Sequence, residues 1–513
     1  MLRLDMANWV LALDPPRATG LPIYLQVARA ITEDIRRGRL RPGAKVPSSR
    51  LLARHLSVHR NTVLAAYGEL IAEGWLVTSP ARGTFVSETI PEPRLRNQRP
   101  QDLVGADRPG LPGHAIRSSP FVHRPEILAA GCLDLSTGNP DLRAFPIEAL
   151  GRAYRRALRG NYSHLLGYCD PEGHAGLREA IATMVSATRG IAATAANVFV
   201  TRGALMAMML VGRSIAEPGE VIAVEALGYR PGWEAFRQAG IRLAPVPVDS
   251  QGLRVDALGE LADRLRLRAL YLTPHHQYPT TVTLSPGRRM QLLELAAANG
   301  ITIIEDDYDH EFHYHGNPIM PLASLDRHGL VIYIGTLSKV LAPGLRIGYV
   351  VAAQPLIEAL AGHRSFVDAC GDHVIEAAVA QLLDDGEVPR HINRLRRVYR
   401  KRRDAMVDAL NSRLGSDITF TPPSGGMAVW VKTEIDVEAW AASALAHGVA
   451  FHTGRRYTFD GMPIPYVRLS FAGLSEEHLE KAVSRMASAV PVPPPPGSAV
   501  AAYSTRPGRT TDP

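Results

Sequence analysis

The spacing of apolar residues in the first part of the chain predicts three short helices and a hairpin. Residues 22–37 carry apolar side chains at helical spacing, and Gly38 ends the run. Two more helical runs, SSRLLARHL and SVHRNTVLAAYGELIAEG, each begin with a serine that suits a helix N-cap. WLVTSPARGTFVS then has the pattern of two short strands around a Pro/Gly turn. Residues 20–87 are therefore predicted to form a winged helix-turn-helix.

From about residue 132 to residue 490 the pattern changes to strand-like apolar runs that alternate with helical stretches. NVFVT, EVIAVEA, ALYLTP, ITIIEDD and VIYIGT are examples of these runs. Such alternation is typical of an α/β domain with a mostly parallel sheet. Residues 88–131, rich in Pro, Gly and Arg, are predicted to form a flexible linker, and the Pro-rich residues 491–513 a disordered tail.

Charge is concentrated at the amino-terminal end of the chain. The net charge is +7, and residues 1–87 hold twelve Lys and Arg against six Asp and Glu. This points to an anionic partner for that segment. We expect a cytoplasmic protein with no membrane segment and no signal peptide, because no apolar stretch is long enough. The three cysteines show neither a disulfide framework nor metal-ligand spacing.

The third predicted helix begins with side chains that read DNA bases. In a helix-turn-helix the second helix of the pair enters the major groove with its first residues over base edges. The candidate DNA-binding residues are His59, Arg60, Asn61 and Thr62 on that helix, Arg50 on the preceding one, and Arg82 and Gly83 at the wing tip. A solvated helix start and an ordinary turn are the alternative. PIYLQV, LRPGAKVPSSRLLARHL, RNTVLAAYGELIAEGWL and RGTFV resemble the DNA-binding domain of GntR-family transcription regulators, which implies a double-stranded DNA operator as a partner.

In the large domain, Lys339 follows the strand-like run VIYIGT, and Asp306 and Tyr308 end the earlier run ITIIEDDY. Ligands bind at the carboxyl ends of strands in open α/β sheets. A lysine amine forms a Schiff base with an aldehyde, a carboxylate can keep a pyridine nitrogen protonated, and a tyrosine can bond a ring hydroxyl. Arg346, Thr336 and Ser338 suit a phosphate. Together they suit pyridoxal 5'-phosphate, although each alone is more often a surface lysine, an acidic loop or a metal site.

The large domain resembles fold-type I aminotransferases, and residues 20–490 resemble the MocR subfamily of GntR regulators. The resemblance implies that Lys339 is the Schiff-base lysine, Asp306 the partner of the pyridine nitrogen and Tyr308 that of the ring hydroxyl. It implies a phosphate bound by Arg346 with Thr336 and Ser338 close by. It further implies a cofactor-stacking role for Tyr229, a phosphate contact from the partner subunit for Tyr168, and an effector-carboxylate contact for Arg468. Packing or ion-pair roles are the alternatives for these last three.

Two segments depart from ordinary aminotransferases. After Gly203, Ala204 stands in VTRGALMAM without the usual hydroxyl or amide side chain, so only backbone N–H groups of the next helix remain to bind phosphate there. TPHHQYPTTV replaces an Asn-Pro-Thr-Gly-like segment, with Tyr278 in place of an asparagine. The pair His275 and His276 suggests a metal, but no third ligand is suitably spaced, so no metal is expected.

The favoured hypothesis is a transcription regulator that binds DNA and senses an amino compound, or pyridoxal phosphate itself, in its large domain. The resemblance implies a head-to-tail homodimer. A working aminotransferase with an accessory DNA-binding domain is the alternative. A DNA-binder with a dead enzyme domain is disfavoured by the intact set of Lys339, Asp306, Tyr308 and Arg346. The effector, the operator and the sign of regulation are left open.

Overall fold

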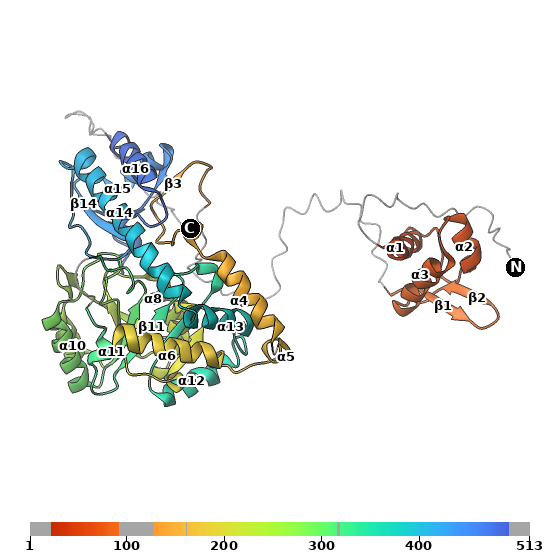
Figure 1. The fold of residues 1–513 in the computed structure, drawn as a ribbon, viewed down its shortest axis with the longest axis horizontal. Coiled ribbons are helices and arrows are strands. Elements are labelled where there is room, and N and C mark those ends of the chain that lie inside the picture. The colour runs from red at the N-terminus through yellow and green to blue at the C-terminus, as the bar shows by residue number, and fades with distance from the viewer. Residues whose placement is uncertain (1–21, 92–126, 161, 315–318, 492–513) are drawn as a thin grey trace, which may run out of the picture. The chain divides into compact units, whose positions relative to one another are not determined.

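The computed structural model describes residues 22–91, 127–160, 162–314 and 319–491 (Figure 1). The chain divides into two compact units, residues 1–118 and 119–513. The start of the chain, most of the predicted linker (92–126) and the predicted tail (492–513) lie outside the described residues. Within the described ranges, no helix combines the length and the hydrophobicity needed to cross a lipid bilayer.

The amino-terminal unit is a winged helix-turn-helix, which confirms the prediction. Its elements are α1 (Ile23–Arg36), α2 (Ser49–His55), α3 (Arg60–Ala72) and the antiparallel hairpin of β1 (Leu76–Ser79) and β2 (Gly83–Val86). Val27, Ile31, Val63 and Leu70 are buried in its core. The Tyr67 hydroxyl donates a hydrogen bond to the Pro47 carbonyl at 2.8 Å. This bond ties α3 to the segment that precedes α2.

The predicted serine cap of α2 is confirmed, but that of α3 is wrong. Ser48 caps α2, accepting a hydrogen bond from the Leu51 amide at 3.3 Å. Ser57 instead has a φ of 53° and belongs to the turn, which the Val58 amide closes by donating to the Ala53 carbonyl at 3.0 Å. His59 is the N-cap of α3, and its ring accepts from the Asn61 amide at 3.2 Å. The turn includes Ser57 and Val58, so the N-cap and the start of the helix both lie two residues later than predicted.

A seven-stranded sheet forms the centre of the large unit. Its strand order is β4-β12-β11-β10-β9-β5-β6. The bounds are β4 (Val198–Thr201), β5 (Val221–Glu225), β6 (Arg242–Val246), β9 (Leu267–Leu272), β10 (Thr302–Asp307), β11 (Val331–Thr336) and β12 (Gly348–Val351). Neighbouring strands run parallel except where β12 pairs antiparallel with β11 and β4. The predicted α/β class with a mostly parallel sheet is confirmed.

Helices cover both faces of this sheet, because the strands are apolar on both sides. Along β10, Ile304 packs into one hydrophobic cluster and its neighbour Ile303 into another. The Ile304 side holds α7 (Ala204–Ile215), α8 (Arg230–Gln238) and α12 (Gln354–Arg364). The other side holds α6 (Ala175–Arg189), α9 (Val255–Arg264), α10 (Pro286–Asn299), α13 (His373–Asp384) and part of α14 (Glu387–Leu414).

A second, antiparallel sheet lies in the carboxyl-terminal part of the large unit. Its order is β13-β14-β17-β16, with bounds β13 (Ile418–Thr419), β14 (Ala428–Thr433), β16 (His452–Thr453) and β17 (Tyr466–Ser470). It lies with α15 (Val437–Ala446) and α16 (Glu476–Ser488) at the blue end of the unit, and α14 runs from there toward the central sheet (Figure 1). β15 (Val449–Ala450) pairs with β3 (Leu133–Asp134). The remaining elements are α4 (Ile147–Arg159), α5 (Tyr162–Leu165), α11 (Leu322–Leu325), β7 (Val248–Asp249) and β8 (Gly252–Leu253).

Candidate functional site

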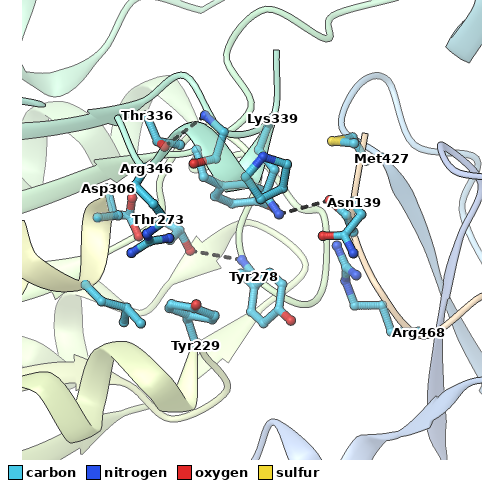
Figure 2. A pocket seen from close by; sticks show the side chains of 16 residues that line it. Asn139, Tyr229, Thr273, Tyr278, Asp306, Thr336, Lys339, Arg346, Met427 and Arg468 are labelled. Atoms are coloured by element: carbon cyan, nitrogen blue, oxygen red, sulfur yellow. Dashed lines mark hydrogen bonds between the residues drawn. The ribbon is translucent and has the colours of Figure 1, made fainter. Parts of the chain in front are cut away.

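A cavity of about 280 Å³ opens beyond the carboxyl ends of β9, β10 and β11 (Figure 2). These three strands are parallel neighbours, so their carboxyl ends, and the loops that follow them, lie at the same edge of the sheet. Most of the predicted cofactor and effector residues line this cavity: Lys339, Asp306, Tyr308, Arg346, Thr336, Ser338, Tyr229, Ala204 and Arg468. The structure therefore gathers side chains that are up to 264 positions apart, as with Ala204 and Arg468, around one space.

Lys339 follows β11, and its amine lies within the cavity. Its Nζ donates a hydrogen bond to the Gly138 carbonyl at 2.9 Å. Burial lowers the pKa of Lys339 to about 8, and the nearby positive charge of Arg468 acts in the same direction. The amine is thus closer to neutral at physiological pH than a surface lysine, which suits a nucleophile.

Asp306, near the end of β10, lines the cavity, and one of its carboxylate oxygens is buried without a hydrogen-bond partner among the described residues. The Tyr271 hydroxyl donates to Oδ2 at 2.8 Å. Oδ1 is buried and has no hydrogen-bond partner among the described residues. Burial raises the pKa of Asp306 to about 7, against the hydrogen bond from Tyr271, which lowers it. A protonated ring nitrogen opposite Oδ1 would supply both the missing donor and a compensating charge.

Three tyrosines form an aromatic wall beside these groups. The ring of Tyr278 meets the rings of Tyr229 and Tyr308 edge to face, with centroids 5.5 and 5.9 Å away. The Tyr308 hydroxyl donates to the His276 carbonyl at 3.0 Å. Tyr229 is the N-cap residue of α8 and therefore stands at the end of the loop that connects β5 to this helix. The wall offers flat apolar surface to a planar ligand.

The residues around Arg346 and Gly203 are suited to binding an anion. Arg346 has a φ of 53°, and its Nη2 donates to the Arg202 carbonyl at 2.6 Å. A Cβ at Gly203, whose φ is 90°, would lie 2.8 Å from Arg346 Nη2, so glycine is needed there. Gly203 is the N-cap of α7, which has no side-chain cap, so its first N–H groups remain to face an anion. Thr336 Oγ1 accepts from the Ser338 amide at 3.1 Å.

Arg468 reaches the cavity from β17 in the antiparallel sheet. It is 3% exposed, and its guanidinium lies 4.7 Å from the centre of the Tyr278 ring. A Cβ at Gly138 would lie 3.7 Å from Arg468 Nη1 and 3.8 Å from Lys339 Nζ. The Arg468 guanidinium and the Lys339 amine therefore both lie close to Gly138, and a planar guanidinium is a group that can bind a ligand carboxylate bidentately.

Sequence reasoning missed several lining residues, namely Gly138, Asn139, Thr273 and Met427. STGNP at 136–140 indicates a turn, but nothing in that pattern says which site the turn faces. Thr273 accepts a hydrogen bond from the Tyr278 amide at 2.9 Å and donates one to Glu225 at 2.9 Å. It thereby holds the Tyr278 loop to the sheet.

Tyr168 differs from the other predicted cofactor residues. It is 97% exposed and does not line the cavity of its own chain. The resemblance assigned it to the partner subunit's site, which a single chain does not contain.

The expectation that His275 and His276 lack a third metal ligand is wrong. His313, from the segment after β10, lies beside them, and the three potential ligand atoms are within 4.8 Å of one another. The three positions are too far apart in the chain for a spacing motif to reveal them, since the loop after β9 and the loop after β10 meet only in the fold.

The predicted DNA-binding residues lie on the surface of the amino-terminal unit. Arg50, His59, Arg60 and Asn61 are exposed and Thr62 is half-buried. Arg60 Nε donates to Ser49 Oγ at 3.4 Å. At the wing, the Arg82 and Lys45 cations lie 5.8 and 5.9 Å from the Phe85 ring. Lys45, which the sequence pattern did not single out, adds to this basic surface, and a Cβ at Gly83 would lie 2.9 Å from its Cε.

Comparison with known protein families matches both units. Residues 23–86 match the family described as bacterial regulatory proteins, gntR family. Residues 130–486 match the family described as aminotransferase class I and II.

Relatives match the chain both as a whole and in its large unit. The probable rhizopine catabolism regulatory protein MocR of Rhizobium meliloti is 29% identical over 94% of this chain and 96% of its own length. The HTH-type transcriptional regulator TauR of Rhodobacter capsulatus is 32% identical over 91% of this chain and 96% of its own. Among solved structures, the large unit is similar to LysN, an α-aminoadipate aminotransferase from Thermus thermophilus, in complex with N-(5'-phosphopyridoxyl)-L-leucine. The TM-score is 0.66 and the sequence identity is 32%, and the match covers 70% of this chain and 92% of that chain.

Proposed function

This chain belongs to the MocR-type regulators of the GntR family, which join a GntR DNA-binding domain to an aminotransferase-like domain, and we propose how it works. The winged helix reads a double-stranded operator, and the cavity of the large unit holds pyridoxal phosphate and senses an amino compound or the cofactor itself. The observation that carries the proposal is that Asp306, whose buried Oδ1 finds no hydrogen-bond partner in the described part of the chain, lines the same cavity as Lys339.

The residues of the cavity fit pyridoxal phosphate part by part. When bound, the cofactor supplies an aldehyde and an electron-withdrawing ring. Lys339 presents the amine for the aldehyde, Asp306 accepts from the ring nitrogen, and Tyr308 bonds the ring hydroxyl. Arg346, Thr336, Ser338 and the amides of Gly203 and Ala204 bind the phosphate, and Tyr229 stacks on the ring.

Arg468 is proposed to bind the carboxylate of an amino-acid-like effector. Its guanidinium is buried beside Gly138, close to the Lys339 amine. A ligand with an amine and a carboxylate a few bonds apart would place its carboxylate at the Arg468 guanidinium and its amine near Lys339. The Thermus thermophilus relative, whose structure holds a phosphopyridoxyl derivative of leucine, supports a ligand of this class.

We further propose a head-to-tail homodimer. Tyr168 is exposed and does not line its own chain's cavity, and in a dimer it would contact the phosphate of the partner subunit's cofactor. Two copies would also present two winged helices to two half-sites.

A working transaminase is the second candidate function. It is favoured by the lowered pKa of Lys339, which suits an amine that carries protons during turnover. One measurement distinguishes the two functions. A transaminase converts an added amino acid to its keto acid, whereas a regulator changes its DNA binding when the amino acid is added.

The cofactor proposal is tested by the visible spectrum of the purified chain with added pyridoxal phosphate, followed by borohydride reduction and peptide mapping. We expect a yellow protein with the phosphopyridoxyl group on Lys339, no such label in Lys339→Ala, and normal labelling in the control Lys401→Ala, which removes an exposed lysine. A label elsewhere, or none, would contradict the assignment.

The regulatory proposal is tested by selecting bound duplexes from a random DNA library with and without pyridoxal phosphate and amino acids. An enriched sequence whose affinity changes with the small molecule supports a regulator. Keto-acid formation without any enriched sequence would instead establish the transaminase.

A further inference from the structure

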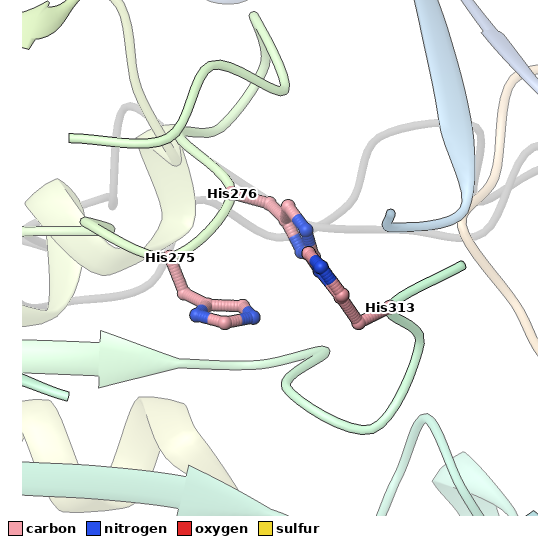
Figure 3. Close-up of side chains that lie close together, drawn as sticks. All are labelled: His275, His276 and His313. Atoms are coloured by element: carbon pink, nitrogen blue, oxygen red, sulfur yellow. The ribbon is translucent and has the colours of Figure 1, made fainter. Parts of the chain in front are cut away.

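A cluster of histidines lies next to the cavity but outside its lining (Figure 3). His275 and His276 come from the loop after β9, and His313 from the segment after β10. The ring centroids of His275 and His276 are 4.5 Å apart, and those of His276 and His313 are 6.3 Å apart in a stacked pair. One potential ligand nitrogen from each residue lies within 4.8 Å of the other two.

The first two histidines are buried with nitrogens that lack partners. His275 is 3% exposed and His276 is 1% exposed. Neither ring nitrogen of His275, nor Nε2 of His276, has a hydrogen-bond partner in the described part of the chain. Leaving such polar atoms unpaired in the interior costs about 1–3 kcal/mol each. A bound group that accepts the lone pairs of imidazole nitrogens or hydrogen-bonds to them would remove this cost.

Asp309 orients one of these rings. His276 Nδ1 lies 2.8 Å from Asp309 Oδ1, and both side chains are 1% exposed. With Nδ1 donating to the carboxylate, Nε2 carries a free lone pair. Metal-binding histidines are held in this way by a carboxylate on the other ring nitrogen, which fixes the ring and raises its basicity. The carboxylate also offsets part of the charge of a bound cation.

We propose that His275, His276 and His313 bind one divalent transition-metal ion of the zinc class. Three imidazoles with a fourth position left for water form a known zinc arrangement, and nitrogen ligands select such ions over magnesium or calcium. His313 is half-buried and lines a separate cavity of about 430 Å³ with Arg189, Glu311 and Arg396, so this edge of the cluster borders open space. A small movement of the rings would bring the three nitrogens to bonding distance.

The site would hold the wall of the cofactor cavity in place. The loop after β9 carries His275, His276 and then Tyr278, which lines the cavity. The His276 carbonyl accepts the Tyr308 hydrogen bond at 3.0 Å. An ion that ties this loop to His313 would restrict both tyrosines. The metal proposal rests on the histidine geometry alone and stands whether or not the proposed regulatory function holds.

The experiment titrates the tag-free, full-length chain, first treated with a chelator, with Zn²⁺ by calorimetry and with Co²⁺ by visible difference spectroscopy. We expect one ion per chain, cobalt bands of a four-coordinate site, and displacement of Co²⁺ by Zn²⁺. His275→Asn and His313→Gln should each weaken binding by at least about tenfold, and Asp309→Asn by roughly 10–100-fold. His328→Gln, which changes an exposed histidine, should bind normally.

Unchanged affinity in the ligand variants, or a wild-type chain that binds neither ion, would overturn the proposal and leave a cluster filled by water. Circular dichroism checks folding. If His275→Asn fails to fold, His313→Gln, at the half-buried edge of the cluster, decides the question.

Discussion

At the scale of single residues, Lys339 shows how burial changes the protonation of a side chain. An amine in water holds its proton up to a pKa of 10.5, whereas burial beside Arg468 lowers the pKa of Lys339 to about 8. The Gly138 carbonyl accepts a hydrogen bond from the amine at 2.9 Å and so fixes its position, but it carries no negative charge that would stabilise the protonated form. Because a buried lysine cation would cost stability, the lowered pKa favours the neutral amine, which is the form that reacts with an aldehyde.

This shift predicts how cofactor capture depends on pH. Because the neutral amine reacts and its fraction grows as pH rises through the pKa, the rate of pyridoxal phosphate capture should reach half its maximum at about pH 8 and level off roughly one unit higher. The unfolded chain binds more protons than the folded chain between pH 8 and 10.5, so the stability of the cofactor-free chain should rise with pH across that window.

Stopped-flow absorbance measures the capture rate across this range, and Lys339→Ala supplies the background. A rate that keeps rising about tenfold per pH unit well above pH 9 would mean that the lysine has the ordinary pKa of an exposed amine.

At the scale of elements, the start of α3 decides what the DNA-binding unit can read. The turn holds Ser57 and Val58, His59 caps the helix, and Arg60 is its first residue. Arg60 Nε donates a hydrogen bond to Ser49 Oγ of α2 at 3.4 Å. Two helices thus share the positioning of the side chain that is expected to meet a base edge.

Replacing Arg60 should therefore weaken specific DNA binding. Arg60→Ala should cost about 1–3 kcal/mol on the selected operator and broaden base choice at one position, because a bidentate contact to a base is lost. Fluorescence anisotropy at two salt concentrations measures this. Arg327→Ala, an exposed arginine of the large unit, is the control. Equal losses on operator and random DNA would make Arg60 a phosphate contact.

At the scale of the whole molecule, two separate cores carry two functions. The winged helix has its own hydrophobic cluster, and the large unit buries its apolar side chains in other clusters. Among the described residues, those that line the cavity all belong to the large unit. A ligand in that cavity consequently stabilises the large unit directly.

Calorimetry should show two thermal transitions. Saturating pyridoxal phosphate at about 100 times its Kd should stabilise the large unit by about 2.7 kcal/mol and raise its transition by several degrees. The transition of the winged helix should stay where it is. Joint movement of both transitions would mean that the units stabilise each other, and the isolated winged helix, residues 1–118, would then melt at a lower temperature than in the full chain.

Local patterns were enough to predict the fold class, the winged helix and six of the sixteen residues that line the cavity, and the resemblance to aminotransferases added others such as Tyr229 and Arg468. Apolar spacing reflects which face of a helix or strand is buried, and parallel strands must end at a common edge. The resemblance to aminotransferases drew Lys339, Asp306 and Arg346 together, and the structure places all three around one cavity. Their roles in cofactor binding stay predictions.

Only the tertiary structure decided which loops meet. It brought Gly138 to Lys339, left Tyr168 exposed outside its own cavity, and set His313 beside a histidine pair 37 and 38 positions earlier in the chain. The spacing of residues along a chain records contacts within a helix, strand or turn. Contacts between loops depend on how strands and helices pack, and no local pattern carries that information.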